Sequence, residues 1–469
     1  MNKEKLFGLN PNFLTVGYAH LIKSAIFLRY GINADQKISL STKTSPIFKD
    51  LEIFQKGVGA QVNDQSVLVG TIRMGYGHHR MAYALYSWVL AKKLKPYLHD
   101  LLGIESNEAI AIKEIDGLYS QMSRVSSEWG GPVEWAWGQL TAQGNIGSLL
   151  LSSLLAESYK NMMSDLSRSL PNISTYPLNG QIAVEAGFKN VVHLICDNFP
   201  QYYLLVPGAL NLVQSPASYH KFIDMGVPKE NLHIAGHWVS EPIVTNVMVD
   251  SIARIERIQK QKSKRLLLPI GGAGAQKNYT ISFIDNIKNK LKNGELHLFI
   301  NTGDHIGMFE ILKTEIEKMG LNYHIVSNWD TLLEFCKTHS FEATEESKLK
   351  PITLFTYGNY YEAFTTTDYL IRISDILVTK PSELAFYPIP KLFIRRVGDH
   401  EAASAFRSME LGEGTTECRE PEHAFKMVKL LTEQSPILQR MNECVIRNAK
   451  YGIYDGAKNA VEIAMKGSI

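Results

Sequence analysis

Short apolar runs alternate with longer mixed runs along most of the chain from Ser66 onward. Short apolar runs are typical of buried strands, and the mixed runs between them are typical of crossover helices. In the first half, the runs that predict strands are residues 66–72, 172–175, 190–196, 210–215 and 231–236. In the second half, they are residues 264–270, 295–303, 321–327, 352–357, 374–380 and 390–396. The pattern predicts an α/β protein with two doubly wound parallel sheets.

The alternation of apolar and mixed runs is interrupted between Gly236 and Lys264, where a turn-like segment precedes a polar helical stretch. We place the domain boundary there. The predicted organisation is an N-terminal extension (1–60), a first doubly wound domain (61–245), a second one (246–445) and a C-terminal helix that crosses back to the first (446–469).

The segment from Leu14 to Gly31 predicts a helix, and two interpretations stay open for it. It can lie on the first domain as an amphipathic helix, or it can contact a membrane surface. No run reaches the ~20 apolar residues that a membrane span needs. The four scattered cysteines lack any paired spacing, so we expect neither disulfides nor zinc and place the protein in the cytoplasm, at most at the inner face of a membrane.

The composition of the 469 residues, 45% hydrophobic and 20% charged, is that of an ordinary soluble globular protein. Forty-nine basic residues against forty-seven acidic ones leave a formal net charge of +2. Proteins that bind nucleic acid by neutralising phosphates carry a basic excess or a basic stripe. The charge balance therefore argues against nucleic acid as a partner.

A glycine-containing turn follows the first predicted strand and opens a helix. It comprises Gly75, Tyr76, Gly77, His78, His79 and Arg80. Glycines let a ligand approach the backbone, and a helix N-terminus favours anionic or polarised oxygens. Because ligands bind outside the carboxyl ends of parallel strands, His78 is placed to take a proton from an acceptor hydroxyl. Capping or packing of the helix is the alternative for His78 and, with more weight, for His79.

A second turn of small residues follows a strand in the second half of the chain. It consists of Gly271, Gly272, Ala273, Gly274, Ala275 and Gln276. Such a turn can present backbone amides to a diphosphate at a helix N-terminus. It lacks both the Lys-Ser/Thr ending of a P-loop and the third glycine of a dinucleotide fingerprint. A plain strand-to-helix turn is the alternative.

Polar residues recur after two later strands. Lys380 ends one strand, and Glu383 follows Pro381 in the first turn of an expected helix, where its carboxylate can accept two ribose hydroxyls. After the next strand, His400 and Glu401 stand where a sugar could be hydrogen-bonded. Helix capping and surface charge are the alternative. The other histidines lack metal-ligand spacing, so we expect no metal site.

The order of these turns and strands resembles the two-domain GT-B glycosyltransferases of the family that contains monogalactosyldiacylglycerol synthase and the lipid-linked N-acetylglucosaminyltransferase of peptidoglycan assembly. The resemblance runs from about residue 66 to 440. It implies two Rossmann-like domains facing a cleft, the first binding an acceptor and the second a nucleotide sugar. The GYGHH turn looks like the family's GGGH-type turn, which implies that His78 is the base on the acceptor hydroxyl.

The resemblance also implies roles for other residues. Near the acceptor it places Gly75, Gly77, His79 and, as a second catalytic group, Asp197. In the donor site it implies a diphosphate turn from Gly271 to Gln276, a ribose site at Ser382 and Glu383 beside Lys380, a sugar site at His400 and Glu401, and a nucleobase near Tyr357.

The chain departs from the family pattern at three places. The glycine-containing loop expected between Lys380 and Glu383 is missing, which puts the family's diphosphate contact there in question. His400 stands in place of the usual glutamine and Ser404 in place of asparagine, so the donor sugar stays open. Tyr76 replaces a glycine of the first turn.

The leading expectation is transfer of a hexose from a nucleoside-diphosphate sugar, a UDP-sugar by resemblance, to a hydroxyl acceptor. The transfer would invert the sugar and need no cofactor or metal. A lipid acceptor is implied by the resemblance alone. A sugar-nucleotide 2-epimerase or hydrolase of the same fold and a non-catalytic ligand-binding relative are the alternatives.

Overall fold

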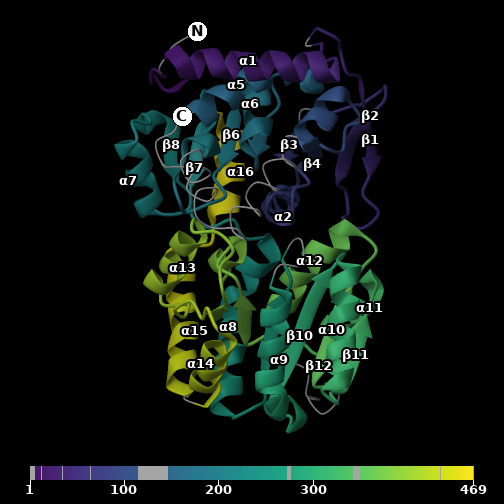
Figure 1. The fold of residues 1–469 in the computed structure, drawn as a ribbon, viewed down its shortest axis with the longest axis vertical. Helices are drawn as coiled ribbons and strands as arrows, with labels where there is room; N and C mark the ends of the chain where they lie inside the picture. Colours follow the sequence, from purple (N-terminus) through teal and green to yellow (C-terminus); the bar gives the residue numbers. More distant parts are fainter. Residues whose placement is uncertain are drawn as a thin grey trace. The chain divides into compact units, whose positions relative to one another are not determined.

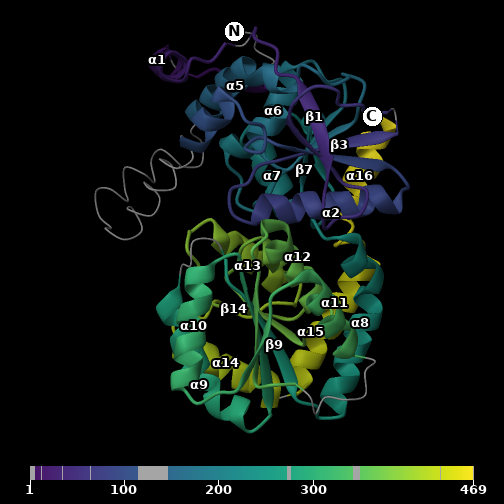
Figure 2. The same cartoon turned by 90° about the vertical axis from the view of Figure 1, so that its right-hand side faces the viewer.

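The computed structural model describes residues 6–11, 13–33, 35–63, 65–114, 146–271, 276–341, 349–433 and 435–467. The chain divides into two compact units. The first comprises Met1–Met74, Met81–Trp238 and Asp455–Ile469, and the second comprises Gly75–Arg80 and Val239–Tyr454. Figure 1 labels the helices and strands of both units, and Figure 2 gives a second view.

The described part of the first unit contains an eight-stranded sheet in the order β1-β2-β4-β3-β5-β6-β7-β8. The strands are β1 (Leu40–Thr44), β2 (Glu52–Lys56), β3 (Ser66–Thr71), β4 (Lys95–Asp100), β5 (Asn172–Ser174), β6 (Val191–Leu194), β7 (Leu210–Val213) and β8 (Leu232–Ile234). β1 and β2 pair antiparallel, and the other neighbouring pairs are parallel. The chain order reverses at β3, so the loops after β3 and β5 diverge at a switch point.

Helices cover this sheet. They are α1 (Phe13–Tyr30), α2 (Gly77–Ala91), α5 (Gly147–Tyr159), α6 (Pro177–Glu185), α7 (Pro216–Asp224) and α16 (Gly456–Lys466). α1 lies along α5, and α16 lies beside β5 and β6 (Figure 1). α7 shows how the sequence starts a helix here: Pro216 occupies its first turn, and the Ser215 hydroxyl accepts a hydrogen bond from the Ser218 N–H at 3.1 Å.

The described part of the second unit contains a six-stranded sheet in the order β11-β12-β10-β9-β13-β14, with every neighbouring pair parallel. Its strands are β9 (Lys264–Pro269), β10 (Leu296–Gly303), β11 (Tyr323–Val326), β12 (Ile352–Thr356), β13 (Ile376–Thr379) and β14 (Lys391–Phe393). The chain moves from β9 to one side of the sheet and returns to the other side for β13. The switch point therefore lies between β9 and β13.

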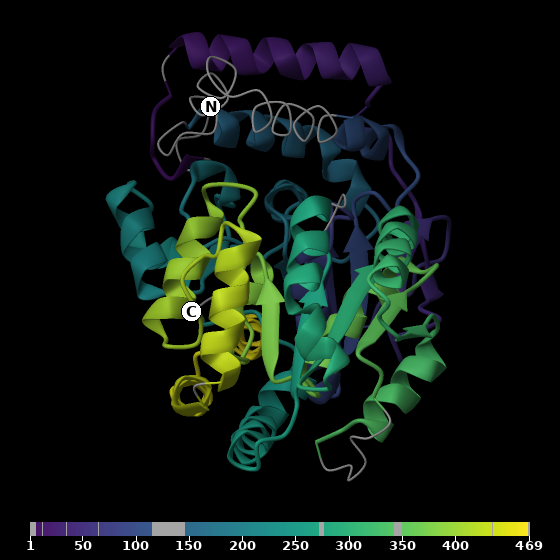
Figure 3. The ribbon, with the colours of Figure 1, turned by 60° about the horizontal axis from the view of Figure 1, so that its bottom comes forward.

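Helices cover both faces of the second sheet, as Figure 2 shows. They are α8 (Glu241–Gln259), α9 (Lys277–Lys292), α10 (Ile306–Lys318), α11 (Trp329–Thr338), α12 (Tyr360–Ile371), α13 (Glu401–Glu410), α14 (Pro421–Glu433) and α15 (Ser435–Lys450). In Figure 3, α14 and α15, in yellow-green to yellow, pack side by side next to the strands. Because helices cover both faces, the side chains of β9 and β10 are buried almost throughout, and the middle of β9 is apolar at each position from Leu266 to Leu268.

A fully buried ion pair joins β14 to the end of the second unit. Lys391 Nζ donates to Glu413 Oε2 at 2.9 Å and to the carbonyl oxygens of Tyr387 and Ile389 at 2.6 and 2.9 Å. The other carboxylate oxygen of Glu413 accepts hydrogen bonds from Asn448 and Tyr454. Burial lowers the pKa of Lys391, while the Glu413 carboxylate acts in the opposite direction. The many partners make the enclosed pair tolerable, since a buried charge is costly unless it is paired and hydrogen-bonded.

The prediction of two doubly wound parallel sheets is confirmed, and each apolar run that predicts a strand contains one. The helix predicted near the N-terminus is α1. The sequence pattern does not predict β1, β2 or β4. β1 and β4 are rich in polar residues, as in LSTKT and KPYLHD, and pairing within the sheet overrides that composition. No described helix is both long and apolar enough to cross a membrane.

The start of α16 tests how closely the C-terminal helix is packed. A Cβ atom on Gly456 would lie 2.3 Å from the carbonyl oxygen of Gly236. Backbone atoms cannot move aside cheaply, so we expect Gly456→Ala to lower the free energy of unfolding by about 1–3 kcal/mol in urea titrations. Gly307→Ala, at the start of α10, is the control, because a Cβ atom there meets nothing within 4 Å. Equal stability of the two variants would contradict the packing.

Candidate functional site

The carboxyl ends of β9 and β13 lie side by side at the switch point of the second sheet. β9 leads into Gly271, and β13 leads into Lys380. A Cβ atom on Gly271 would lie 3.3 Å from Lys380 Cε, so the glycine leaves room for the lysine stem. Ligands of open α/β sheets bind in the crevice where such loops diverge. We take these two loops as the core of the candidate site.

Lys380 is paired with Glu401, the first residue of α13. Its Nζ atom donates to Glu401 Oε1, and Glu401 Oε2 accepts a hydrogen bond from the Val397 N–H at 2.8 Å. The lysine side chain is 29% exposed and the glutamate side chain 5%. The cation thus borders the solvent, while the carboxylate is enclosed.

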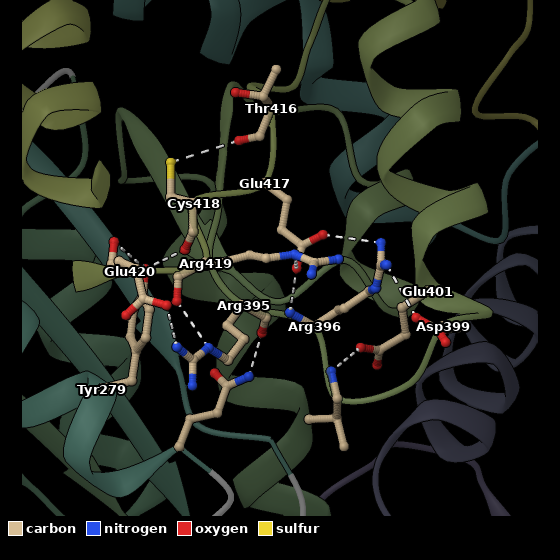
Figure 4. A network of polar contacts seen from close by, with 12 residues as sticks. Tyr279, Arg395, Arg396, Asp399, Glu401, Thr416, Glu417, Cys418, Arg419 and Glu420 are labelled. Atoms are coloured by element: carbon tan, nitrogen blue, oxygen red, sulfur yellow. Dashed lines mark hydrogen bonds and ion pairs between the residues drawn. The ribbon is translucent and has the colours of Figure 1, made fainter. Parts of the chain in front are cut away.

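The loop after β14 is held by the polar network drawn in Figure 4. Arg396 bonds Glu417 through its backbone N–H and Nη1, at 3.0 and 3.1 Å, and its Nη2 lies 3.0 Å from Asp399 Oδ1. Arg395 Nη2 donates to Glu420 Oε1 at 2.7 Å. This network fixes the backbone that leads into Glu401.

The same network reaches the end of the small-residue turn. The side-chain amide of Gln276 donates to the carbonyl oxygen of Arg395. The Tyr279 hydroxyl donates to the Cys418 carbonyl at 2.6 Å (Figure 4). Gln276 has a φ of +73°, a left-handed conformation that is uncommon outside glycine. Residues 272–275 of the turn lie outside the described residues.

Arg80 lies between two carboxylates of the second unit. Its Nε is 3.5 Å from Glu383 Oε1, its Nη1 is 3.8 Å from Asp368 Oδ1, and its Nη2 donates to Thr367 Oγ1 at 3.0 Å. Burial raises the pKa of the Glu383 carboxyl, but Arg80 and Lys380 outweigh it, so that pKa is lowered overall. Glu383 is therefore a carboxylate at neutral pH.

Asp368 behaves differently from Glu383. Burial raises its pKa to about 6, although Arg80 and a 2.6 Å hydrogen bond from the Ser240 hydroxyl act against that shift. Its side chain is only 5% exposed, so it has lost more hydration than the partly exposed Glu383. The motif GYGHHR contains Arg80, but its two carboxylate partners could not be read from the sequence.

Tyr76, the second residue of the GYGHHR turn, packs at the end of β10. Its hydroxyl bonds the Asp304 carboxylate and accepts a hydrogen bond from the Asp304 N–H at 3.1 Å. The rings of His305 and Tyr360 lie 5.7 and 5.5 Å from its ring. A Cβ atom on Gly303 would lie 2.2 Å from the Tyr76 hydroxyl, which explains the glycine there. Burial raises the pKa of Tyr76, so it stays protonated.

The two histidines of the turn differ in exposure. His78 is half-buried in the first turn of α2 and so remains open to solvent, as its proposed role needs. His79 is 1% exposed, with Tyr360 5.0 Å and Phe364 5.9 Å away between ring centres. The structure favours packing for His79, so we leave it out of the residues that would meet a ligand.

Three further expectations need correction or placement. The segment after Pro381 is not an α-helix but a short 3-10 turn, Glu383–Phe386, because Pro388 and Pro390 prevent a longer helix. Tyr357 is 1% exposed, so its ring belongs to the core rather than to a nucleobase platform. Asp197 follows β6 in the first unit. Burial raises the pKa of the Cys196 thiol, and the negative charge of Asp197 raises it further.

The remaining residues that the sequence predicts for a donor site follow β13 and β14. Ser382 is half-buried, and its N–H donates to the Lys380 carbonyl oxygen at 2.8 Å. His400 is exposed directly before α13, whereas Ser404 within that helix is 2% exposed. Within the described ranges, no group of three or more His, Cys, Asp or Glu side chains could hold a metal ion.

Two family models match the chain. The model described as Domain of unknown function (DUF6938) matches residues 227–465, half of the chain, and the chain belongs to this family. The model described as Domain of unknown function (DUF6937) matches residues 7–223. A search of curated proteins found no match.

Several solved structures are similar to this chain. UDP-GlcNAc 2-epimerase from Neisseria meningitidis, bound to UDP-GlcNAc, has 11% identity and a TM-score of 0.47, over 86% of this chain and 100% of its own. WaaG, a glycosyltransferase involved in lipopolysaccharide biosynthesis, has 12% identity and a TM-score of 0.45, over 86% and 100%. Trehalose-6-phosphate synthase from Burkholderia multivorans has 11% identity and a TM-score of 0.40, over 85% of this chain and 98% of its own. These neighbours are GT-B fold proteins.

The raised pKa of Asp368 predicts a pH-dependent stability. Between its ordinary value of 3.8 and about 6, the folded protein binds more protons than the unfolded chain, so stability from this group is lost as pH rises through that window. Asp368→Asn cannot ionise. We expect its free energy of unfolding, relative to wild type, to increase by roughly 1–3 kcal/mol between pH 4.5 and 7.

Urea unfolding at four pH values in that range measures this difference. Asp285→Asn on α9, where the side chain is 49% exposed, is the control and should show no comparable trend. A constant difference between wild type and Asp368→Asn across the range would show that Asp368 is ionised throughout.

Proposed function

We propose that the chain transfers a hexose from a nucleoside-diphosphate sugar, a UDP-sugar, to a hydroxyl acceptor. The observation that carries the proposal is the meeting of Gly271 and Lys380 at the switch point of the second sheet, with Glu401 joined to the lysine. A diphosphate needs backbone donors and a cation, and a sugar needs hydrogen-bond acceptors for its hydroxyls. The described residues at this edge include the cation, Lys380, and two carboxylates that could accept hydrogen bonds, Glu383 and Glu401.

The donor would lie across these loops. Its diphosphate would contact the turn from Gly271 to Gln276 and Lys380, its ribose would bond the Glu383 carboxylate near Ser382, and its sugar would bond His400 and Glu401. The lowered pKa of Glu383 supports its part, because an ionised carboxylate can accept two ribose hydroxyls. The exposure of His400 supports contact with a ligand.

His78 would act as the general base. The imidazole takes the proton of the acceptor hydroxyl as the acceptor oxygen forms a bond to the anomeric carbon. The bond from that carbon to the diphosphate breaks, and UDP leaves from the opposite face, so the configuration inverts. Lys380 and the backbone amides of the turn stabilise the negative charge on the departing diphosphate. Asp197 stays a proposed acceptor contact.

Two other readings predict different products. A 2-epimerase or hydrolase would isomerise or release the sugar with no acceptor present. A non-catalytic relative, whether or not it binds nucleotide, would transfer no sugar to any acceptor. The resemblance further extends the transferase proposal to a lipid acceptor, so the acceptor panel should include diacylglycerol in vesicles beside soluble alcohols.

Thermal shift with UDP-, GDP-, dTDP- and CMP-sugars tests the donor. A ligand that binds only the folded protein stabilises it by ~2.7 kcal/mol at a hundredfold excess over its Kd, and we expect a UDP-sugar to give the largest shift. Absence of a shift with every nucleotide sugar would contradict the proposal.

His78→Ala tests the chemistry. We expect the variant to keep the thermal shift and to lose transfer about 10²- to 10⁴-fold, because general base catalysis contributes that much. His220→Ala, an exposed histidine on α7, is the matched control and should keep full turnover. Turnover of His78→Ala at the wild-type rate would remove His78 from the mechanism, and product formed without an acceptor would favour the epimerase or hydrolase.

A further inference from the structure

The short turn after β13 is poorly equipped to hold a diphosphate through its backbone. Pro381 has no N–H, and the N–H of Ser382 already donates to the carbonyl oxygen of Lys380 at 2.8 Å. The N–H of Ala385 is also used, by the carbonyl oxygen of Ser382 at 3.0 Å. Two backbone N–H groups of this turn are thus already occupied, which favours a side chain as the main partner of an anion here.

Lys380 is the cation at this place that borders the solvent, since the Arg80 side chain beside Glu383 is buried. Its stem lies against Gly271, where any larger residue would crowd it, and its ammonium group borders the solvent. A lysine carries its charge on a flexible four-carbon stem, so the ammonium can turn from one anion to another without movement of the backbone.

Glu401 does not depend on Lys380 to keep its place. Its second oxygen holds the Val397 N–H at 2.8 Å, and the residue starts α13, where the helix dipole favours a negative charge. The Arg396 network with Glu417 and Asp399 fixes the loop that supplies Val397. A lysine that leaves would therefore expose a carboxylate that is already in position.

We infer that Lys380 and Glu401 exchange partners when the donor binds. Lys380 turns from the carboxylate to the diphosphate, and Glu401 then accepts hydrogen bonds from hydroxyls of the donor sugar. This inference rests on the proposed function and adds to it that the resting ion pair competes with the donor.

The exchange has two opposite consequences for affinity. Removing the lysine charge should weaken UDP far more than UMP, because only the diphosphate offers the second phosphate. Removing the glutamate charge should raise the affinity for UDP, because Lys380 then no longer has to break an ion pair with Glu401 to reach the diphosphate. The same change should abolish any gain in affinity that an attached sugar brings.

Titration calorimetry with UMP, UDP, UDP-glucose and UDP-N-acetylglucosamine measures these differences. For Lys380→Gln we expect UDP to bind roughly 10- to 100-fold more weakly, the worth of a hydrogen bond to a charged group, with UMP changed less than about threefold. Lys380→Arg should recover part of the loss. For Glu401→Gln we expect UDP to bind severalfold more tightly, and neither UDP-sugar to bind better than UDP.

Lys318→Gln, at the far end of α10 from this edge of the sheet, controls for the loss of one positive charge, and circular dichroism checks that each variant is folded. If the wild-type protein binds UDP and the Lys380→Gln variant binds it equally well, the exchange of partners is wrong, while the proposed function stands. Glu401→Gln weakening UDP as much as Lys380→Gln would also overturn the exchange, because Glu401 would then hold the lysine in place. A wild-type protein that binds no nucleotide would overturn the proposed function and the exchange together.

Discussion

In the second unit every neighbouring pair of strands is parallel, so the residues that follow the strands leave the sheet at one edge. Gly271, Asp304, Lys380 and Arg395 are far apart in the sequence, yet each follows a strand of this sheet. The buried apolar strands fix this arrangement, because a shift of register would move their side chains out of the core. The candidate site depends on that constraint before it depends on any polar contact.

The charged groups of the second unit fall into two kinds. The pair of Lys391 and Glu413 is fully enclosed and fully hydrogen-bonded, as a structural pair must be to offset the cost of desolvation. The pair of Lys380 and Glu401 keeps one partner at the solvent border. An ion pair that is half open can be divided by a ligand, whereas the enclosed one cannot. This contrast separates the ion pair that we place in the site from the one that only stabilises the fold.

Much of the fold could be predicted because most of its strands are short apolar runs in the sequence. The centres of β3 and β9, Val67–Val69 and Leu266–Leu268, are runs of consecutive apolar residues, as expected for strands that are buried on both faces. β4 could not be found in this way, since it contains Lys95, His99 and Asp100. In the candidate site, Lys380 and Glu401 come after predicted strands. They could be predicted from the sequence because ligands bind at the carboxyl ends of parallel strands. The contacts of Arg80 with Asp368 and Glu383 join residues that are distant in the sequence, so the local sequence around each residue does not predict them. The burial of His79 and Tyr357 likewise depends on tertiary packing.

The central claim is that a nucleoside diphosphate binds where β9 and β13 end. Hydrogen-exchange mass spectrometry with and without UDP tests it most directly, because bound ligand slows the local opening of the backbone it contacts. We expect slower exchange in peptides that span residues 268–278 and 379–386, with no change in peptides at the opposite edge of the sheet, such as residues 319–323. Protection confined to other loops, or no protection at saturating UDP, would contradict the account.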